Sequence, residues 1–319
     1  MNLARLLCAS LASLSMLASS WAAGYPTKPV ELVVAYQPGG GSDNTARAIA
    51  DAVHPIFPQS VYVVNKPGAS GSIGWSYVAT GPADGYRLVL MTPEMLVVPL
   101  MGIGKTTVDE FQPIARFTDD PSSITVRADA PWHTIQEFLA YAKANPGRVA
   151  ISNAGNGTVP HMAAAALGES VDIAFTHVPY QGSAPAIVDL IGGQLDFMVV
   201  DTTAIAHVES GQLKLLAITN PERSAQLPDT PTIAEAGVPG YETINWYGLF
   251  LPAKTSPEIV QALNQVIQKV LADPSTQSRF KTLRADLPPA LDSEAFTEFV
   301  RADTRKWDAL VKSLNLSLD

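Results

Sequence analysis

The sequence predicts an α/β protein in which two lobes each carry a mixed, mostly parallel β-sheet. β-rich apolar runs alternate with amphipathic segments that begin at a helix-capping residue, which is the rhythm of βα units on such a sheet. Glycine-rich turns follow several of these runs. The 319 residues also exceed what one hydrophobic core usually organises, so we expect about two domains.

The composition is that of a globular protein and excludes several classes of function. Hydrophobic residues make up 47% of the chain and charged residues 16%, which excludes disorder, coiled coil and collagen. The 30 acidic and 21 basic side chains give a net charge of −9. Binding to a phosphate backbone needs clustered Lys and Arg, so nucleic acid is not an expected partner. A small anionic ligand is compatible with this charge if backbone N–H groups meet it.

Residues 1–22 are predicted to be a cleavable signal peptide. Arg5 supplies a positive start, and the apolar run at 6–17 ends before small residues at the cleavage positions. This run is too short to span a bilayer, which needs about 20 residues. The alternative interpretation of the segment is an uncleaved signal anchor. The one cysteine, Cys8, lies in this segment, so the mature chain would have no disulfide and no cysteine nucleophile. We expect a soluble, exported protein.

The elements can be predicted in chain order. Apolar, β-rich runs bounded by turn residues predict strands at 30–36, 61–65, 86–92, 149–152, 174–178, 197–200 and 213–218. Each predicted helix begins at a cap that precedes apolar residues at helical spacing. The caps are Ser42 or Asp43, the capping box of Thr134 and Glu137, Thr158, Ser183, and Ser256 before Pro257. A last helix is predicted at 293–314.

Two extended crossings are expected to join the lobes. They cover residues 115–126 and 244–252, which are rich in β-formers and contain or end in proline. Because the chain crosses twice, one lobe is discontinuous. Lobe 1 would comprise residues 23–121 and 249–319, and lobe 2 residues 122–248.

Two glycine-rich turns after strands form the candidate ligand site. In the first, Gly39, Gly40 and Gly41 let the backbone turn sharply and present N–H groups near the positive end of a helix. Ser42 or Asp43 would cap that helix. The second turn repeats the arrangement with Ser152, Asn153, Ala154, Gly155, Asn156, Gly157 and Thr158. Two helix N-termini facing each other across a cleft would hold a carboxylate from both sides. The alternative is that both are ordinary βα turns.

Three further positions have two interpretations each. Asp201 stands at the carboxyl end of a predicted parallel strand, where ligands of α/β sheets bind, or it caps the next helix. His161 lies one turn after Thr158. Its ring either reaches the cleft or is buried in the core with its hydrogen bonds satisfied. Trp246 and Tyr247 are cleft aromatics or, as is commoner, core.

Motifs for metal, nucleotide or nucleophilic chemistry fail on inspection. The five histidines form no i, i+4 pair. Residues 102–106 resemble the end of a phosphate-binding loop, but Pro99 stands where its first glycine belongs. Residues 68–71 lack the spacing of a nucleophile elbow. We therefore expect no metal, no cofactor and no catalytic residue.

Ordered motifs along the mature chain carry a family resemblance. They are YPTKPV from Tyr25, PGG from Pro38, VNKPGASG from Val64, VPYQGSAPA from Val178, LPDTPT from Leu227 and PGY from Pro239. The sequence resembles the Bug-type extracytoplasmic solute receptors, the substrate-binding component of tripartite tricarboxylate transporters. The resemblance implies a type II, Venus-flytrap periplasmic binding protein that closes on a small carboxylate.

The resemblance also implies where the ligand is held. In the family, the first glycine loop and the Ser/Gly-rich loop of the second lobe hold a carboxylate, partly through ordered water. Here these loops correspond to 36–43 and 152–158, and Thr92 and Tyr180 complete the expected contacts. Tyr36 and Gln37 replace the family's common Phe-Pro, Gln181 stands where Lys is frequent and Thr202 where Asn is frequent. These differences from the family predict a more polar rim of the cleft. They bear on which carboxylate is bound.

The resemblance therefore implies a monomeric periplasmic receptor without enzymatic activity. It would bind a di- or tricarboxylate, an aromatic carboxylate or an acidic amino acid, and deliver it to the membrane subunits of the transporter. One alternative is a sensory receptor that docks on the periplasmic domain of a sensor kinase. A periplasmic enzyme is a further alternative, but it needs a nucleophile and a base, for which there is no motif.

Overall fold

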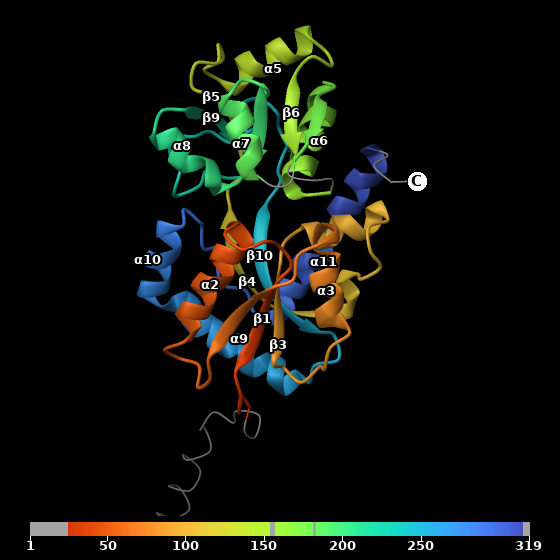
Figure 1. Ribbon diagram of the computed structural model, residues 1–319, viewed down its shortest axis with the longest axis vertical. Helices are drawn as coiled ribbons and strands as arrows, with labels where there is room; N and C mark the ends of the chain where they lie inside the picture. The colour runs from red at the N-terminus through yellow and green to blue at the C-terminus, as the bar shows by residue number, and fades with distance from the viewer. Residues whose placement is uncertain (1–24, 154–156, 181–182, 315–319) are drawn as a thin grey trace, which may run out of the picture.

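The computed structural model describes residues 25–153, 157–180 and 183–314 and confirms an α/β fold of two lobes (Figure 1). The predicted signal peptide lies outside the described residues. Within the described ranges, no helix has the length and apolar character needed to cross a membrane. Each lobe is built on one five-stranded sheet. We call the lobe that contains β1 the first lobe and the other the second lobe.

The sheet of the first lobe has the strand order β2-β1-β3-β10-β4. β1 pairs in parallel with β2 and β3, whereas β10 pairs antiparallel with β3 and β4. Only β10 therefore runs against the others, and the sheet is mostly parallel as predicted. The strands are β1 (Val30–Val34), β2 (Val61–Asn65), β3 (Arg87–Met91), β4 (Phe111–Asp120) and β10 (Asn245–Pro252).

The sheet of the second lobe has the order β7-β6-β8-β5-β9. β6 pairs in parallel with β7 and β8, and β5 pairs antiparallel with β8 and β9. In this sheet, β5 runs antiparallel to the other four strands. The strands are β5 (Ser123–Arg127), β6 (Ala150–Asn153), β7 (Thr176–Pro179), β8 (Phe197–Val200) and β9 (Leu213–Ile218).

Helices cover both faces of each sheet, and their apolar stripes supply the cores. In α2, buried Ala46, Ile49, Ala50 and Val53 recur at helical spacing and face the sheet. The helices of the first lobe are α2 (Gly41–Val53), α3 (Ser72–Ala79), α4 (Glu94–Val97), α9 (Pro257–Ala272), α10 (Pro274–Thr282) and α11 (Ser293–Leu314). Those of the second lobe are α5 (Ile135–Ala144), α6 (Val159–Val171), α7 (Ser183–Ile191) and α8 (Ile205–Glu209). Short 3-10 turns are η1 (Ala69–Gly71), η2 (Val98–Met101), η3 (Val108–Glu110) and η4 (Thr202–Ala204).

β10 is buried along its whole length because both of its faces meet a core. Tyr247 and Leu249 belong to the hydrophobic cluster under α2 and α9, whereas Trp246 and Phe250 belong to the cluster under α3 and α11. Alternate residues of a strand point to opposite faces, which explains this division. The prediction of core positions for the rings of Trp246 and Tyr247 is confirmed.

The chain passes between the lobes at two adjacent places. β4 ends at Asp120 and β5 of the other sheet begins at Ser123; β10, which returns to the first sheet, pairs Asn245 with Asp120. The expected boundary at 121/122 thus falls between β4 and β5, while that at 248/249 falls inside β10. We propose the lobe boundaries at 121/122 and at the start of β10.

Candidate functional site

The first glycine-rich turn leaves the start of α2 without a side-chain cap. The N-cap residue is Gly40, and no side-chain cap hydrogen bond is made there. The expectation that Ser42 or Asp43 caps α2 is wrong, because the helix begins at Gly41 and both lie in its first turn. Within the described part of the chain, no acceptor is found for the N–H groups of Gly41 and Ser42. These groups can therefore meet an anion.

Asp43 stabilises this turn by accepting hydrogen bonds. Its carboxylate accepts hydrogen bonds from the Gly39 N–H at 2.9 Å, Arg47 Nε at 3.0 Å and Asn65 Nδ2 at 2.9 Å. Burial opposes ionisation, but the bonds from Arg47, Gly39 and Asn65 outweigh it and lower the pKa of Asp43. Asp43 is therefore an ionised structural residue, while Gln37 stays exposed at the rim.

The second turn is held by His161. The Gly157 N–H donates to His161 Nδ1 at 3.1 Å, and the His161 ring packs edge-on against His177. Burial, together with His177, lowers the pKa of His161 to about 4, so the ring is neutral near pH 7. His161 is thus a satisfied buried histidine that orders the turn. Gln181 and the turn residues Ala154, Gly155 and Asn156 lie outside the described residues, and Ser152 is buried at the end of β6.

Gly157 brings this turn against the first lobe. Its φ is +78°, and a Cβ at this position would lie 2.9 Å from Met101 Sδ in η2. Met162, the fourth residue of α6, is fully buried in the first-lobe cluster that contains Val97 and Val98. The N-terminal half of α6 is therefore packed on the opposite lobe.

Each helix N-terminus of the site faces a carboxylate of the opposite lobe. Glu94 of α4 accepts a hydrogen bond from the Val159 N–H, the first residue of α6, at 3.2 Å. Asp201, which follows β8, places Oδ2 only 3.4 Å from the point where a Cβ on Gly41 would stand. Oδ1 of Asp201 accepts from the Thr203 N–H at 3.0 Å and caps η4. Asp201 therefore caps η4, which confirms one of its two interpretations, and it lies next to the first lobe; its contact with a ligand stays a prediction.

Three acidic side chains from different elements act electrostatically on Tyr247. The pKa of Tyr247 is raised first by burial and then by Asp120, Asp201 and Glu94. The pKa of Asp120 is raised well above its usual range by burial and by Asp201, and burial is also the main cause that raises the pKa of Glu94. We call Glu94, Asp120, Asp201 and Tyr247 the acidic cluster.

The acidic cluster was not predicted as a unit. Asp201 was a candidate, but Glu94 and Asp120 were missed, and Tyr247 was placed in the core without a role for its hydroxyl. One signal was present for Glu94: it is the lone charge in an apolar stretch from Met91 to Met101. Asp120 likewise ends a β-rich run at the expected crossing. A buried charge needs an explanation, which neither position has locally.

The other predicted contacts are distributed around this cluster. The hydroxyl groups of Tyr36 and Thr92 are buried beside Glu94 and have no hydrogen-bond partner among the described residues. Tyr180 instead donates to Asp189 Oδ2 of α7 at 2.7 Å, so its hydroxyl is engaged within the second lobe. No group of three metal-ligating side chains occurs in residues 25–153, 157–180 and 183–314.

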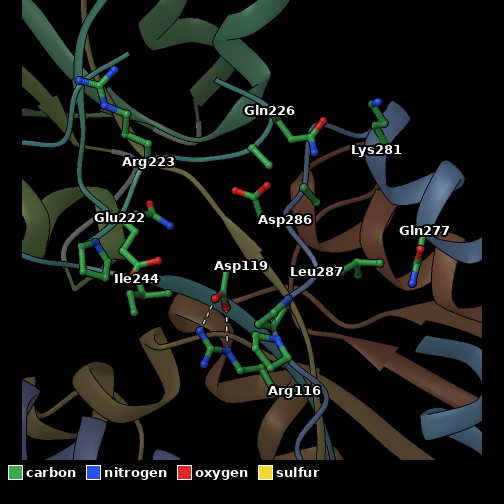
Figure 2. A pocket seen from close by; sticks show the side chains of 16 residues that line it. Arg116, Asp119, Glu222, Arg223, Gln226, Ile244, Gln277, Lys281, Asp286 and Leu287 are labelled. Atoms are coloured by element: carbon green, nitrogen blue, oxygen red, sulfur yellow. Dashed lines mark hydrogen bonds and ion pairs between the residues drawn. The ribbon is translucent and has the colours of Figure 1, made fainter. Parts of the chain in front are cut away.

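A separate pocket of about 690 Å³ lies on the other face of β4 (Figure 2). Asp119 lines it and pairs with Arg116, whereas the next residue, Asp120, does not line it. Gln226 from the second lobe and Asp286 from the first lobe face this pocket. The pocket shares no residue with the acidic cluster, and successive strand residues point to opposite faces.

Comparison with known proteins places the chain among solute receptors. The family model TctC, described as tripartite tricarboxylate transporter family receptor, matches residues 45–316. The structure of the periplasmic binding protein BugD is 35% identical, with a TM-score of 0.81, and the match covers 92% of this chain and 99% of that one. R. palustris Rpa4515 with adipate is 29% identical, with a TM-score of 0.82 and coverage of 91% and 98%. MatC from Rhodopseudomonas palustris with bound malate is 28% identical, with a TM-score of 0.80 and coverage of 90% and 100%.

Proposed function

Because the chain belongs to the TctC family of tripartite tricarboxylate transporter receptors, we propose that it captures a small carboxylate between its two lobes. The observation that carries the proposal is the uncapped start of α2, where the Gly41 and Ser42 N–H groups have no acceptor among the described residues. The relatives with adipate and with malate support a carboxylate ligand.

Capture would replace the water shell of the carboxylate with protein donors. The N–H groups at the start of α2 meet one carboxylate, and the positive end of the helix macrodipole favours it. The Tyr36 and Thr92 hydroxyls, buried without partners in the described chain, are available as further donors. The lobes would close by rotation about the crossing at Asp120 to Ser123 and Asn245. No step of this function forms or breaks a covalent bond, so we propose no enzymatic role.

The proposed receptor function also implies a cellular location for the chain. We propose that residues 1–22 direct the chain to the periplasm and are then removed. The closed, monomeric receptor would present a surface, built from both lobes, to the membrane subunits of a tripartite transporter. Docking on a sensor kinase instead is the competing outcome.

The ligand class can be identified by thermal unfolding of the mature chain, freed of co-purified ligand by unfolding and refolding. The panel comprises dicarboxylates, tricarboxylates, aromatic carboxylates and acidic amino acids. A ligand at 100 times its Kd stabilises the fold by about 2.7 kcal/mol, which raises Tm visibly. A rise for one acid class supports the proposal; no rise across the panel contradicts it.

Gly40→Pro tests the α2 site directly. Gly40 has a φ of −83°, close to the value of about −65° that proline imposes, so the fold should be retained. The substitution removes the N–H next to those of Gly41 and Ser42 and puts a proline ring in front of them. We expect about 10- to 100-fold weaker binding of the acid found in the panel, measured by calorimetry. Gly40→Ala keeps the N–H, and its Cβ would meet only the Gln37 carbonyl oxygen at 3.8 Å, so it should retain most of the affinity. Equal affinities of the two variants would refute the assignment of this turn.

A further inference from the structure

The pocket of about 690 Å³ in Figure 2, which we call the β4 pocket, is built from both lobes beside the crossing. Its volume is in the usual range of ligand pockets, about 300–1,000 Å³. Its walls are Arg116, Asp119, Gln277, Lys281 and residues 285–289 of the first lobe, and residues 220–223, 225, 226 and 244 of the second lobe. An occupant would therefore contact both lobes at once.

Backbone hydrogen bonds hold both walls of the β4 pocket next to the crossing. In the first lobe, Asp286 and Asp119 exchange two backbone hydrogen bonds, at 2.8 Å and 3.1 Å. In the second lobe, the N–H of Thr219, the residue before Asn220, donates to the Ser122 carbonyl oxygen at 2.8 Å. The backbone that carries the pocket side chains is thus already ordered, which lowers the entropic cost of binding a ligand there.

The β4 pocket contains a buried amide whose hydrogen-bonding groups are unused. Asn220 is 8% exposed, and neither its Oδ1 nor its Nδ2 has a hydrogen-bond partner among the described residues. Gln226, on the same wall, makes no hydrogen bond through its side-chain amide within the described ranges. Native proteins rarely leave buried polar groups unpaired, so Asn220 points to a group supplied from outside. A side-chain amide offers both an acceptor and donors, which is the complement of a peptide bond.

The two arginines of the β4 pocket are already engaged with carboxylates of the protein. Arg116 pairs with Asp119 within β4, and its guanidinium carbon lies 4.2 Å from the centre of the Phe299 ring. Arg223 pairs with Glu235 at 2.8 Å. Both guanidinium groups are therefore neutralised before any ligand enters.

The remaining charges of the β4 pocket are two carboxylates and one ammonium group. Asp286 and Glu222 form no ion pair with any residue that the structure describes, and Lys281, exposed on α10, forms none there either. In Figure 2 the Asp286 side chain lies between those of Glu222 and Gln226. Two free acidic groups against one free basic group favour a ligand with a positive charge.

We infer that the β4 pocket receives an extended segment of a partner protein that carries a basic side chain. The basic group would lie against the Asp286 carboxylate, and the backbone of the segment would bind the amides of Asn220 and Gln226. Leu287 and Pro288, both half-buried, offer apolar surface to the rest of the segment. A small amine would satisfy the carboxylate but has no acceptor for the amide N–H groups, so a peptide fits better.

NMR titration of the isotope-labelled mature chain, with no ligand between the lobes, tests this inference. The probes are the blocked tripeptides Ala-Arg-Ala, Ala-Glu-Ala and Ala-Ala-Ala, and methylguanidinium, which carries the cation without a peptide bond. We expect the arginine peptide to shift the backbone amide signals of the pocket-lining residues and to bind about tenfold or more tightly than the other three probes.

Three results of this titration would overturn the inference. The first is the absence of shifts in the pocket-lining residues with the arginine peptide. The second is equal binding of either of the other two peptides, which would show that the basic side chain is not recognised. The third is equal binding of methylguanidinium, which would identify a site for a small cation instead of a partner segment. Because no acid is added, the outcome is independent of the proposed carboxylate site.

Two variants connect binding of the arginine peptide to named side chains. Asp286→Asn removes the charge and keeps the backbone pairing with Asp119, and it should weaken the arginine peptide about tenfold. Asn220→Leu replaces a buried amide that makes no hydrogen bond in the described chain, and a similar loss is expected. Asp109→Asn, an exposed acid of the first lobe outside the pocket, is the matched control and should leave the affinity unchanged. Either pocket variant suffices if the other does not fold, and unchanged affinity in the folded pocket variants would overturn the inference.

Discussion

His161 shows how local structure can fix both the position and the protonation state of one side chain. Its Nδ1 accepts from the Gly157 N–H, which requires the neutral ring with its proton on the other nitrogen. Burial then maintains this state, because the charged form would be desolvated. The result is a fixed turn in front of α6.

The same residue predicts a pH dependence of stability. The pKa of His161 is lowered to about 4 in the folded chain, against 6.5 unfolded, so the unfolded state binds more protons between these values. Its contribution to stability is present above pH 6.5 and is lost as the pH falls toward 4, by about 3 kcal/mol at most. His161→Gln retains an acceptor for Gly157 but does not titrate.

Denaturant unfolding of both proteins between pH 7 and pH 4 provides the measurement. The original chain should lose more stability than His161→Gln over this window. His177, which packs against the ring and also has a lowered pKa, is kept in both proteins, so its own titration largely cancels. Parallel pH profiles would show that His161 does not titrate as described.

The start of α2 illustrates a constraint at the scale of the element. Gly41 is the first residue of the helix, and α2 approaches β10 so closely that a Cβ there would stand 2.9 Å from Tyr247 Oη. Such a contact is shorter than real Cβ atoms tolerate. The helix can therefore take this position beside the acidic cluster only with glycine at its start.

Gly41→Ala should consequently weaken ligand binding without unfolding the lobe. The added methyl group pushes α2 away from Tyr247 and Asp201, and we expect a loss of affinity of about tenfold, with little change in Tm because alanine is a good helix former. Adding Tyr247→Phe removes the hydroxyl that the methyl group meets and should restore part of the affinity. Calorimetry with the acid found in the panel measures both effects; wild-type affinity in Gly41→Ala alone would contradict the close contact.

Most helices and strands could be predicted from the sequence, and those that could not lack a clear apolar pattern. All seven predicted strands occur, because each is an apolar run between turn residues, and α9 and α11 begin at the predicted residues. The crossing segments proved to be strands of the sheets themselves. α10 was not predicted, since only Thr276 and Phe280 of its nine residues are buried and the segment has no apolar stripe. α3 and α4 were missed because they are too short to show a helical period, and the helix after Asp201 was foreseen only as the one that Asp201 would cap.

The candidate site was only partly predictable for a different reason. Glycine turns leave a local signature, so both turns were found. The acidic cluster comes from α4, the crossing, β10 and the end of β8, and no local pattern reveals that Glu94, Asp120 and Asp201 all act on Tyr247. Which polar side chains converge is decided by sheet order, and sheet order is a property of the folded chain.

At the scale of the whole molecule, the two lobes are joined by more than their crossings. α6 of the second lobe packs on α11 and buries Met162 in a cluster of the first lobe. An ion pair between Glu209 and Arg284 adds a surface contact at 2.7 Å, although exposed pairs of this kind contribute little. The two lobes are therefore in direct contact beside the acidic cluster, and not only joined through their crossings.

The position of β10 has a consequence for the order in which the molecule can be made. β10 is the strand that joins β3 to β4, and β4 has no other partner in its sheet. As the chain leaves the ribosome, every strand of the second sheet has therefore emerged before the first sheet can be completed. Until residues 245–252 appear, β1, β2 and β3 can pair with one another, but β3 keeps an open edge and β4 cannot join the sheet. A polypeptide whose first sheet cannot be completed until its last quarter has been synthesised therefore stays incompletely folded for longer.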